Sequence, residues 1–361
     1  MQVNEKLIDY VVEQVVSLVK TPSLAGRTDK AISHIEEELT RAGVKHRRTG
    51  RGALLVTLAG RAPSDGERRA QPDPHRALTA HVDTLGAMVK ELGRDGSLLF
   101  TPVGGYALGT VEGEYVTVEA GSGKLFRGTI LFDEPSAHVS KKVVDTKREF
   151  ENMRIRLDSE VRNEKEVAKL GVAVGDYVHF DPRCEVTETG FIKTRHLDDK
   201  AGVACLLGAL KALAESGLRP RLTTHFLFST SEEVGFGASA GVPQEVGELV
   251  AVDMGAVGKG QESDEYSVCI CAKDSTGPFD YALRQRLVKL CRSQKIPCKV
   301  DIYPFYGSDA AAAVRAGLDA VTGLIGPGIN ASHNLERTHR RALAATVRLV
   351  LAYVEPGGRK C

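Results

Sequence analysis

The sequence predicts an α/β fold into which a small β-rich domain is inserted. Segments typical of strands and helices alternate in the first 87 residues and again after residue 189. Between residues 88 and 188, short strand-like runs alternate with glycines and charges, and no long amphipathic helix is evident. A length of 361 residues also suits about two domains. We therefore expect an α/β domain made of 1–87 and 189–361, and an inserted, barrel-like β domain over 88–188.

The first 87 residues predict two helices followed by two strands. Residues 1–20 have apolar side chains at helical spacing, interrupted by charges, which indicates an amphipathic helix rather than a signal peptide or membrane span. Thr28 can cap a second helix that ends near Gly43. Strands are expected at 52–58 and 76–82, and a flexible surface loop at 61–75 between them.

The remaining elements follow the same periodicities. Short strands are expected in the insertion at 115–120, 126–132, 153–158 and 176–181. After the insertion, helices are expected at 198–217, 278–294, 308–317 and 339–354. Strands are expected between them at 222–230, 249–252, 267–272, 299–303 and 320–325.

Composition excludes several functional classes. A net charge of +1 gives no reason to expect nucleic acid or an anionic membrane as partner. The seven cysteines form no CxxC pair, so a disulfide or zinc framework is disfavoured. Cys205, Cys269 and Cys271 lie in apolar runs and are predicted to be buried, reduced thiols. These features predict a cytoplasmic protein.

Acidic residues and a histidine follow three predicted strands. His81 lies near the end of the strand 76–82 and Asp83 follows it directly, Glu232 and Glu233 follow 222–230, and Asp253 follows 249–252. Ligands of open α/β sheets gather at the carboxyl ends of strands. The sequence therefore predicts a site at this edge.

Each residue also has a simpler interpretation. Asp83 could form only a local hydrogen bond with His81, whereas in a metal site it would orient His81 as a ligand. Asp198 could be a first-turn helix acid rather than a ligand. His333 could be a surface histidine, and His339 is a rival candidate at the start of the last helix. Asp253 ends an apolar strand, where an unpaired charge is costly.

The Glu232–Glu233 pair is harder to explain structurally. Adjacent, partly buried carboxylates repel each other unless cations oppose them or one takes up a proton. In an extended chain the two side chains would point to opposite sides, so different roles are expected: metal ligand and general base. Two histidines with Asp198, Glu233 and Asp253 suit zinc, cobalt or manganese.

Seven segments in order resemble the co-catalytic metallopeptidases of family forty-two, which include tetrahedral (TET), glutamyl and deblocking aminopeptidases. The matching segments are 80–89, 175–178, 195–204, 230–239, 251–255, 307–313 and 331–339. The resemblance implies two divalent metal ions, zinc or cobalt first and manganese also possible. It makes Asp198 the bridging ligand, His81 and Asp253 ligands of one ion, and Glu233 and His333 ligands of the other. Glu232 becomes the general base and Asp83 the partner of His81.

The resemblance also implies architecture and assembly. It implies a three-layer α/β/α catalytic domain, with an inserted domain that forms homodimers able to assemble into a tetrahedral dodecamer. Segments 81–92, 274–281 and 331–339 are similar to a branch associated with synthesis of the osmolyte N-acetylglutaminylglutamine amide. Thr84–Leu85 and Asn330–Ala331 depart from the residues of many members, which affects contacts near His81 and His333.

The predicted function is a dinuclear aminopeptidase that removes N-terminal residues from peptides. Within enzymes, the alternative is an amidase or deacylase acting on small N-acylated peptides. A non-catalytic metal-binding assembly protein is the alternative from another class, although it would not need both glutamates. Carbohydrate hydrolysis is disfavoured because adjacent carboxylates cannot flank a glycosidic bond at the required separation.

Overall fold

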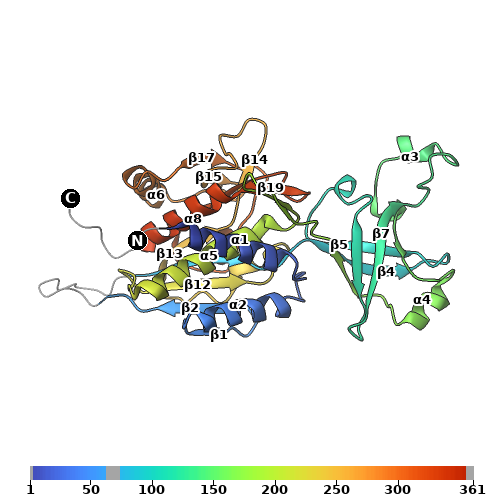
Figure 1. Ribbon diagram of the computed structural model, residues 1–361, viewed down its shortest axis with the longest axis horizontal. Coiled ribbons are helices and arrows are strands. Elements are labelled where there is room, and N and C mark those ends of the chain that lie inside the picture. Colours follow the sequence, from blue (N-terminus) through green and yellow to red (C-terminus); the bar gives the residue numbers. More distant parts are fainter. Residues whose placement is uncertain (1–2, 62–73, 355–361) are drawn as a thin grey trace, which may run out of the picture.

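The computed structural model describes residues 3–61 and 74–354 and shows two bodies (Figure 1). The first and last parts of the chain form an α/β body, and the middle of the chain forms a β-barrel beside it. In the described part of the chain, no helix combines the length and apolarity needed to cross a bilayer.

The α/β body contains a 13-stranded mixed sheet with the main order β1-β2-β12-β3-β13-β18-β19-β11-β10. β14 and β15 both pair with β18, and β15 also pairs with β16 and β17. The strands are β1 (His46–Arg48), β2 (Leu54–Leu58), β3 (His75–His81), β10 (Glu185–Val186), β11 (Phe191–Thr194), β12 (Thr224–Ser229), β13 (Val246–Val252), β14 (Gly255–Val257), β15 (Val268–Asp274), β16 (Gly277–Pro278), β17 (Cys298–Ile302), β18 (Val321–Asn330) and β19 (Glu336–His339).

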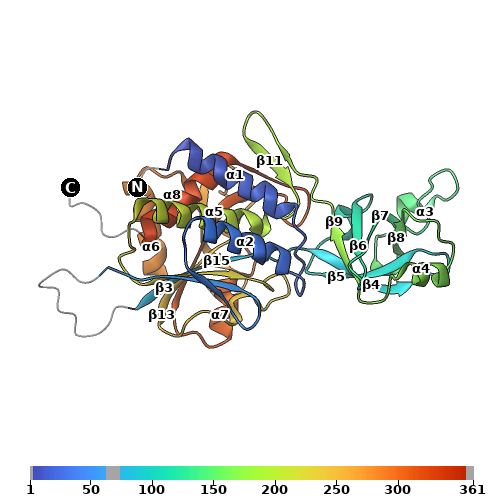
Figure 2. The same cartoon turned by 60° about the horizontal axis from the view of Figure 1, so that its bottom comes forward.

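Helices cover both faces of this sheet, as Figure 2 shows. One face packs against five helices: α1 (Glu5–Val19), α2 (Asp29–Arg41), α5 (Leu197–Ser216), α6 (Tyr281–Ser293) and α8 (Arg340–Val354). The other face packs against α7 (Asp309–Arg315) and the 3-10 helix η3 (Gly237–Ser239).

Alternation along the strands produces these layers. In β12, Phe226 and Phe228 enter the core beneath the five helices, whereas Leu227 enters the core beneath α7. Successive side chains of a strand point to opposite faces, so an all-apolar strand can serve two cores at once. The α/β fold and its three layers are thus confirmed.

The barrel is closed by six antiparallel strands in the order β4-β5-β8-β7-β6-β9. Its own core includes Phe100, Val118, Ile130 and Ile155. The strands are β4 (Gly86–Leu92), β5 (Leu98–Val103), β6 (Tyr115–Glu119), β7 (Leu125–Phe132), β8 (Met153–Leu157) and β9 (Tyr177–Phe180). Short helical elements connect them: η1 (Leu108–Thr110), α3 (Lys142–Asp145), η2 (Phe150–Asn152) and α4 (Glu164–Leu170).

The structure refines several expected boundaries. The barrel strands begin at Gly86 and end at Phe180, while β10, inside the expected insertion, belongs to the large sheet. β4 and β5 were not among the expected strands, and the Lys and Glu in β4 are residue types depleted in strands. Most of the loop expected at 61–75 lies outside the described residues.

Two local predictions about helix ends have different outcomes. Gly43 does end α2: its φ is +68°, its N–H donates to Thr40 O, and the Val44 N–H donates to Leu39 O. Thr28 is the N-cap residue of α2, but its side chain accepts no capping hydrogen bond because its backbone is near the helical region. The expected capping contact at Thr28 is therefore wrong.

Candidate functional site

Three neighbouring parallel strands bring predicted site residues to one edge of the sheet. β3 pairs in parallel with β12 on one side and with β13 on the other. His81 ends β3 level with Ser229, the last residue of β12. Ala251 of β13 pairs with Thr79, so Asp253 lies level with His81. This edge is where open α/β sheets place their ligand sites.

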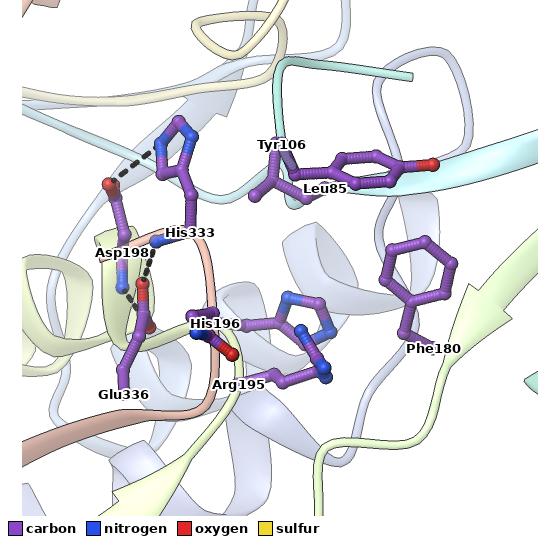
Figure 3. Close-up of a pocket in the computed structure, with 9 residues that line it drawn as sticks. Leu85, Tyr106, Phe180, Arg195, His196, Asp198, His333 and Glu336 are labelled. Carbon is purple, nitrogen blue, oxygen red and sulfur yellow. Dashed lines mark hydrogen bonds and ion pairs between the residues drawn. The ribbon is translucent and has the colours of Figure 1, made fainter. Parts of the chain in front are cut away.

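Asp198 lies between two histidines. Its Oδ1 is 3.0 Å from Nε2 of His81, and its Oδ2 is 3.4 Å from Nε2 of His333. Nε2 of His333 is also 3.8 Å from Oε2 of Glu233. Figure 3 shows the His333 ring facing the Asp198 carboxylate. A carboxylate that faces a different nitrogen donor with each oxygen is arranged to bridge two cations.

The candidate donor atoms form two groups that share His81. In one group, His81 is combined with Asp198 and Glu233; in the other, it is combined with Asp199 and Asp253. Within each group, the donor atoms lie within 4.8 Å of one another. Asp199 was not a predicted site residue. Its carboxylate accepts hydrogen bonds from the N–H groups of His81 and Gly202, at 3.1 and 2.9 Å, so both of its oxygens already support the main chain.

Two buried carboxylate oxygens in these groups lack partners. Among the described residues, none forms a hydrogen bond with Oε1 of Glu233 or Oδ1 of Asp253. Burial, reinforced by the nearby Asp198 carboxylate, raises the pKa of both Glu233 and Asp253 well above the ordinary range. Bound cations would satisfy these oxygens and relieve the repulsion. The mixed nitrogen and oxygen donors therefore fit divalent ions such as zinc, cobalt or manganese.

Glu232 and Glu233 lie in a turn after β12, rather than in the extended chain that the sequence suggested. Asp83 fixes this turn: its two carboxylate oxygens accept hydrogen bonds from the Glu232 and Glu233 N–H groups at 3.0 and 3.1 Å. Oε2 of Glu232 is 3.9 Å from Nε2 of His81. Burial raises the pKa of Glu232 to about 7, although nearby His81 opposes the shift. A carboxylate with such a pKa suits proton transfer near neutral pH.

Asp83 also orients His81, but mainly through its main chain. Nδ1 of His81 lies 3.0 Å from the Asp83 carbonyl oxygen, whereas the Asp83 carboxylate is 3.6 Å away. Because a carbonyl can only accept, this contact places the proton on Nδ1 and directs Nε2 toward Asp198. The expected carboxylate contact is thus replaced by a carbonyl contact.

Comparison with known proteins identifies the family of this chain. The model of the M42 glutamyl aminopeptidase family matches residues 66–349. The chain belongs to the M42 glutamyl aminopeptidase family. YhfE of Bacillus subtilis (strain 168) is 49% identical to this M42 chain over 343 residues, covering 95% of this chain and 96% of YhfE.

Two further proteins that this chain resembles have aminopeptidase or peptidase names. The lysyl aminopeptidase of Pyrococcus furiosus is 23% identical over 300 residues, covering 78% of this chain and 82% of its own. The solved Pyrococcus horikoshii TET1 peptidase has a TM-score of 0.83 at 22% identity, covering 96% of this chain and 99% of its own. The M42 chain is accordingly an enzyme of a peptide-hydrolysing metallopeptidase family.

The M42 chain has a further site residue that the sequence analysis did not single out. The buried Glu336 accepts hydrogen bonds from the N–H of His333 at 3.0 Å and of Asp198 at 3.2 Å. Its position in the segment 331–339 was the available signal, but a glutamate in a polar segment is not distinctive by itself. His339, the rival histidine, lies elsewhere: its Nε2 is 2.9 Å from Thr189 O.

Proposed function

We propose that this chain is a two-metal aminopeptidase whose ions are held by His81, Asp198, Glu233, Asp253 and His333. The observation that supports the proposal best is the position of Asp198, with each carboxylate oxygen facing one histidine. His81 and Asp253 would complete one site, and Glu233 and His333 the other. When bound, two divalent ions would polarise the scissile carbonyl and lower the pKa of the nucleophilic water.

Glu232 would move the proton in this reaction. Its carboxylate is near the donor cluster, and its main chain is fixed by Asp83. With a pKa of about 7, it can accept a proton from the attacking water and deliver it to the leaving amine. A free amino terminus would be held by acidic groups of the site, which favours exopeptidase action.

Turnover of aminoacyl amides is the direct test of this function. Metal-depleted protein would be assayed with zinc, cobalt or manganese added back, each with free-amine and N-acetylated forms of the same peptides. We expect metal-dependent release of N-terminal residues from the free-amine substrates. Preference for the N-acetylated forms would instead identify the amidase alternative, and it would favour the branch associated with N-acetylglutaminylglutamine amide, which stays a prediction. Metal binding without turnover of either set would support the non-catalytic alternative.

The barrel is the proposed self-association domain. Among the solved neighbours, the TET1 peptidase of Pyrococcus horikoshii can assemble into a tetrahedron or a large octahedral shell. In this chain, the barrel exposes Tyr115, Leu125, Val139, Val144 and Val174, apolar side chains that suit a contact with a second copy. We expect homodimers, and a tetrahedral dodecamer built from them. An unchanged number of chains per particle, measured by light scattering after deletion of residues 88–188, would contradict this role.

The cytoplasmic location also stays a prediction. It rests on the cysteines: all six that lie in the described residues are free thiols, and Cys205, Cys269 and Cys271 are buried as expected. Free thiols are typical of reducing compartments.

A further inference from the structure

A loop of the barrel reaches into the candidate metal site. Residues 104–107 connect β5 to η1, and the carbonyl oxygen of Gly105 lies 2.5 Å from Nδ1 of His333. His333 itself follows β18 of the α/β body. Figure 3 shows Tyr106 of this loop among the residues that line one pocket with His333 and Asp198. The contact therefore joins the two bodies at a candidate ligand.

The ring of His333 is restrained less by packing than the side chains of His81 and Asp198 are, so a hydrogen bond matters more for its orientation. Its side chain is 40% exposed, whereas the side chains of His81 and Asp198 are only 2% and 8% exposed. Packing therefore restrains the ring of His81 but leaves the ring of His333 freer to rotate. The Gly105 carbonyl can only accept a hydrogen bond, so it requires the proton on Nδ1 and leaves Nε2 free to bind a cation.

The loop also lies close to Glu233, which together with His333 would hold the second ion. Gly104 has a φ of +80°, and a Cβ at this position would lie 2.4 Å from Cδ2 of Leu85 and 3.5 Å from Cβ of Glu233. The backbone thus approaches more closely than a side chain would allow. The same barrel loop therefore passes close to Glu233 and contacts His333, the two candidate ligands of this ion.

A buried ion pair fixes the barrel beside the start of α5. Nε of Arg195, which comes shortly before Asp198 in the chain, donates to Oε2 of Glu114 at 2.8 Å. Arg195 also donates to the carbonyl oxygen of Thr110, at the end of η1. Arg195 and Glu114 are 5% and 4% exposed. Because a buried ion pair is costly to break, this pair holds the loop that ends at η1 in a fixed position relative to Asp198.

We propose that the barrel loop 104–107 is a positioning element of the catalytic site, with the Gly105 carbonyl orienting His333 to bind the second ion. This inference rests on the proposed function, which assigns His333 as a ligand. The barrel would then contribute to catalysis as well as to assembly. Deleting it would remove the partner of Arg195 and the acceptor of His333, so the shortened chain should also bind the second ion weakly.

Two barrel glycines with nearly the same φ provide a matched test in the full-length chain. Gly104→Ala introduces a methyl group against Leu85 at a φ of +80°, which should displace the loop. Gly123→Ala is the control: Gly123 lies between β6 and β7 with a φ of +83°, and its methyl group would enter open space. Zinc binding would be measured by chelator competition on metal-depleted protein. Loss of an outer partner typically weakens metal binding by about 10- to 100-fold. We expect a loss of this order for the second ion in Gly104→Ala, and near-unchanged binding of both ions in Gly123→Ala.

The outcomes separate this inference from the proposed function. If wild-type protein binds fewer than two ions, the proposed function fails. If wild type binds two and folded Gly104→Ala binds both as tightly, the positioning role fails. Should Gly104→Ala not fold, solid-state ¹⁵N NMR of histidine-labelled, zinc-loaded wild type decides, with His333→Ala as the difference spectrum. The proposal requires a protonated Nδ1 and a zinc-bound Nε2 for His333; the reverse pattern overturns it.

Discussion

The Glu336 carboxylate accepts a hydrogen bond from the main-chain N–H of Asp198, with a donor–acceptor distance of 3.2 Å. Its other oxygen accepts from the N–H of His333, so one buried side chain holds the backbones of two candidate ligands. Asp83 does the same for Glu232 and Glu233. Glu336 and Asp83 bind no cation in the proposed scheme. Glu336 fixes the main chain of the bridging Asp198 and of the ligand His333. Asp83 fixes the main chain of the ligand Glu233 and of the base Glu232.

Glu336→Gln should damage this arrangement without changing its volume. Glutamine has one acceptor oxygen, and its NH₂ group would face an N–H that currently donates to a carboxylate. A buried hydrogen bond left unmade costs about 1–3 kcal/mol, so we expect a loss of this order in the free energy of unfolding of the metal-depleted protein. We also expect the second ion to bind about 10- to 100-fold more weakly. Urea unfolding and chelator competition would measure the two effects.

Glu262→Gln is the control for this substitution, because Glu262 is exposed. It should leave both quantities unchanged. Wild-type metal affinity in Glu336→Gln would show that Glu336 does not position the ligands.

The sequence predicted that these candidate residues meet at one edge because strand ends are visible in a sequence. The apolar runs before His81, Glu232 and Asp253 predicted three strand ends at one edge, and the parallel pairing of β3 with β12 and β13 places them there. Glu336 and Gly105 could not be found in this way. Their roles arise from the approach of segments far apart in the chain, and neither residue type is distinctive in a polar or glycine-rich segment.

The fold shows the same division between local and distant information. The two-sided core of β12 follows from its unbroken apolar run, which is typical of a buried strand. The first and last residues of the barrel domain were harder to predict from the sequence. The chain passes from β3 to β4 with only a few residues between them, and β10 returns to the large sheet inside the expected insertion. Whether a strand joins one sheet or the other is decided by tertiary pairing.

His333 and His339 can be separated by metal analysis. His333→Ala removes a nitrogen that lies 3.4 Å from Asp198 Oδ2, so the purified variant should retain about one ion per chain. His339→Ala removes a ring whose Nε2 faces Thr189 O, and it should retain the wild-type metal content. Plasma mass spectrometry of both proteins would give the stoichiometry. Full loading of His333→Ala would show that the wrong histidine was assigned.

Glu119 lies where the barrel meets α2 and the segment before it. Its carboxylate should make the free energy of unfolding depend on pH. Arg27 donates to its Oε1 at 2.8 Å, and Nε2 of His179 lies 3.0 Å from its Oε2. Burial alone would raise the pKa of Glu119, but these hydrogen bonds outweigh it and lower the pKa to about 2. Because the folded-state pKa is below the unfolded value of about 4.3, the stabilisation is complete above that pH and is lost as pH falls toward 2.

Glu119→Gln removes this charge and should lower the free energy of unfolding near neutral pH. Since Arg27 is 44% exposed and screened by solvent, we expect a loss of about 1–3 kcal/mol. The difference from wild type should shrink as the pH is lowered from 5 toward 2, measured by urea unfolding across that range. A difference that stays constant with pH would mean that the Glu119 charge does not stabilise the fold.

Glu232 and Glu233 provide the most direct test of the mechanism, because Asp83 holds the main chain of both in the same way. Replacing either with glutamine keeps its N–H and its volume, so differences between the variants come from the side-chain carboxylates. Glu233→Gln removes a charge close to His333 and Asp198, and metal affinity should fall. Glu232→Gln should keep both ions but lose the proton acceptor. General base catalysis contributes about 10²- to 10⁴-fold, and we expect kcat to fall by at least that factor while substrate binding changes much less.

Metal content and steady-state kinetics on one aminoacyl amide would be measured together. If Glu232→Gln loses metal and Glu233→Gln retains it, the two roles are reversed. Near-normal turnover of fully loaded Glu232→Gln would show that another group accepts the proton.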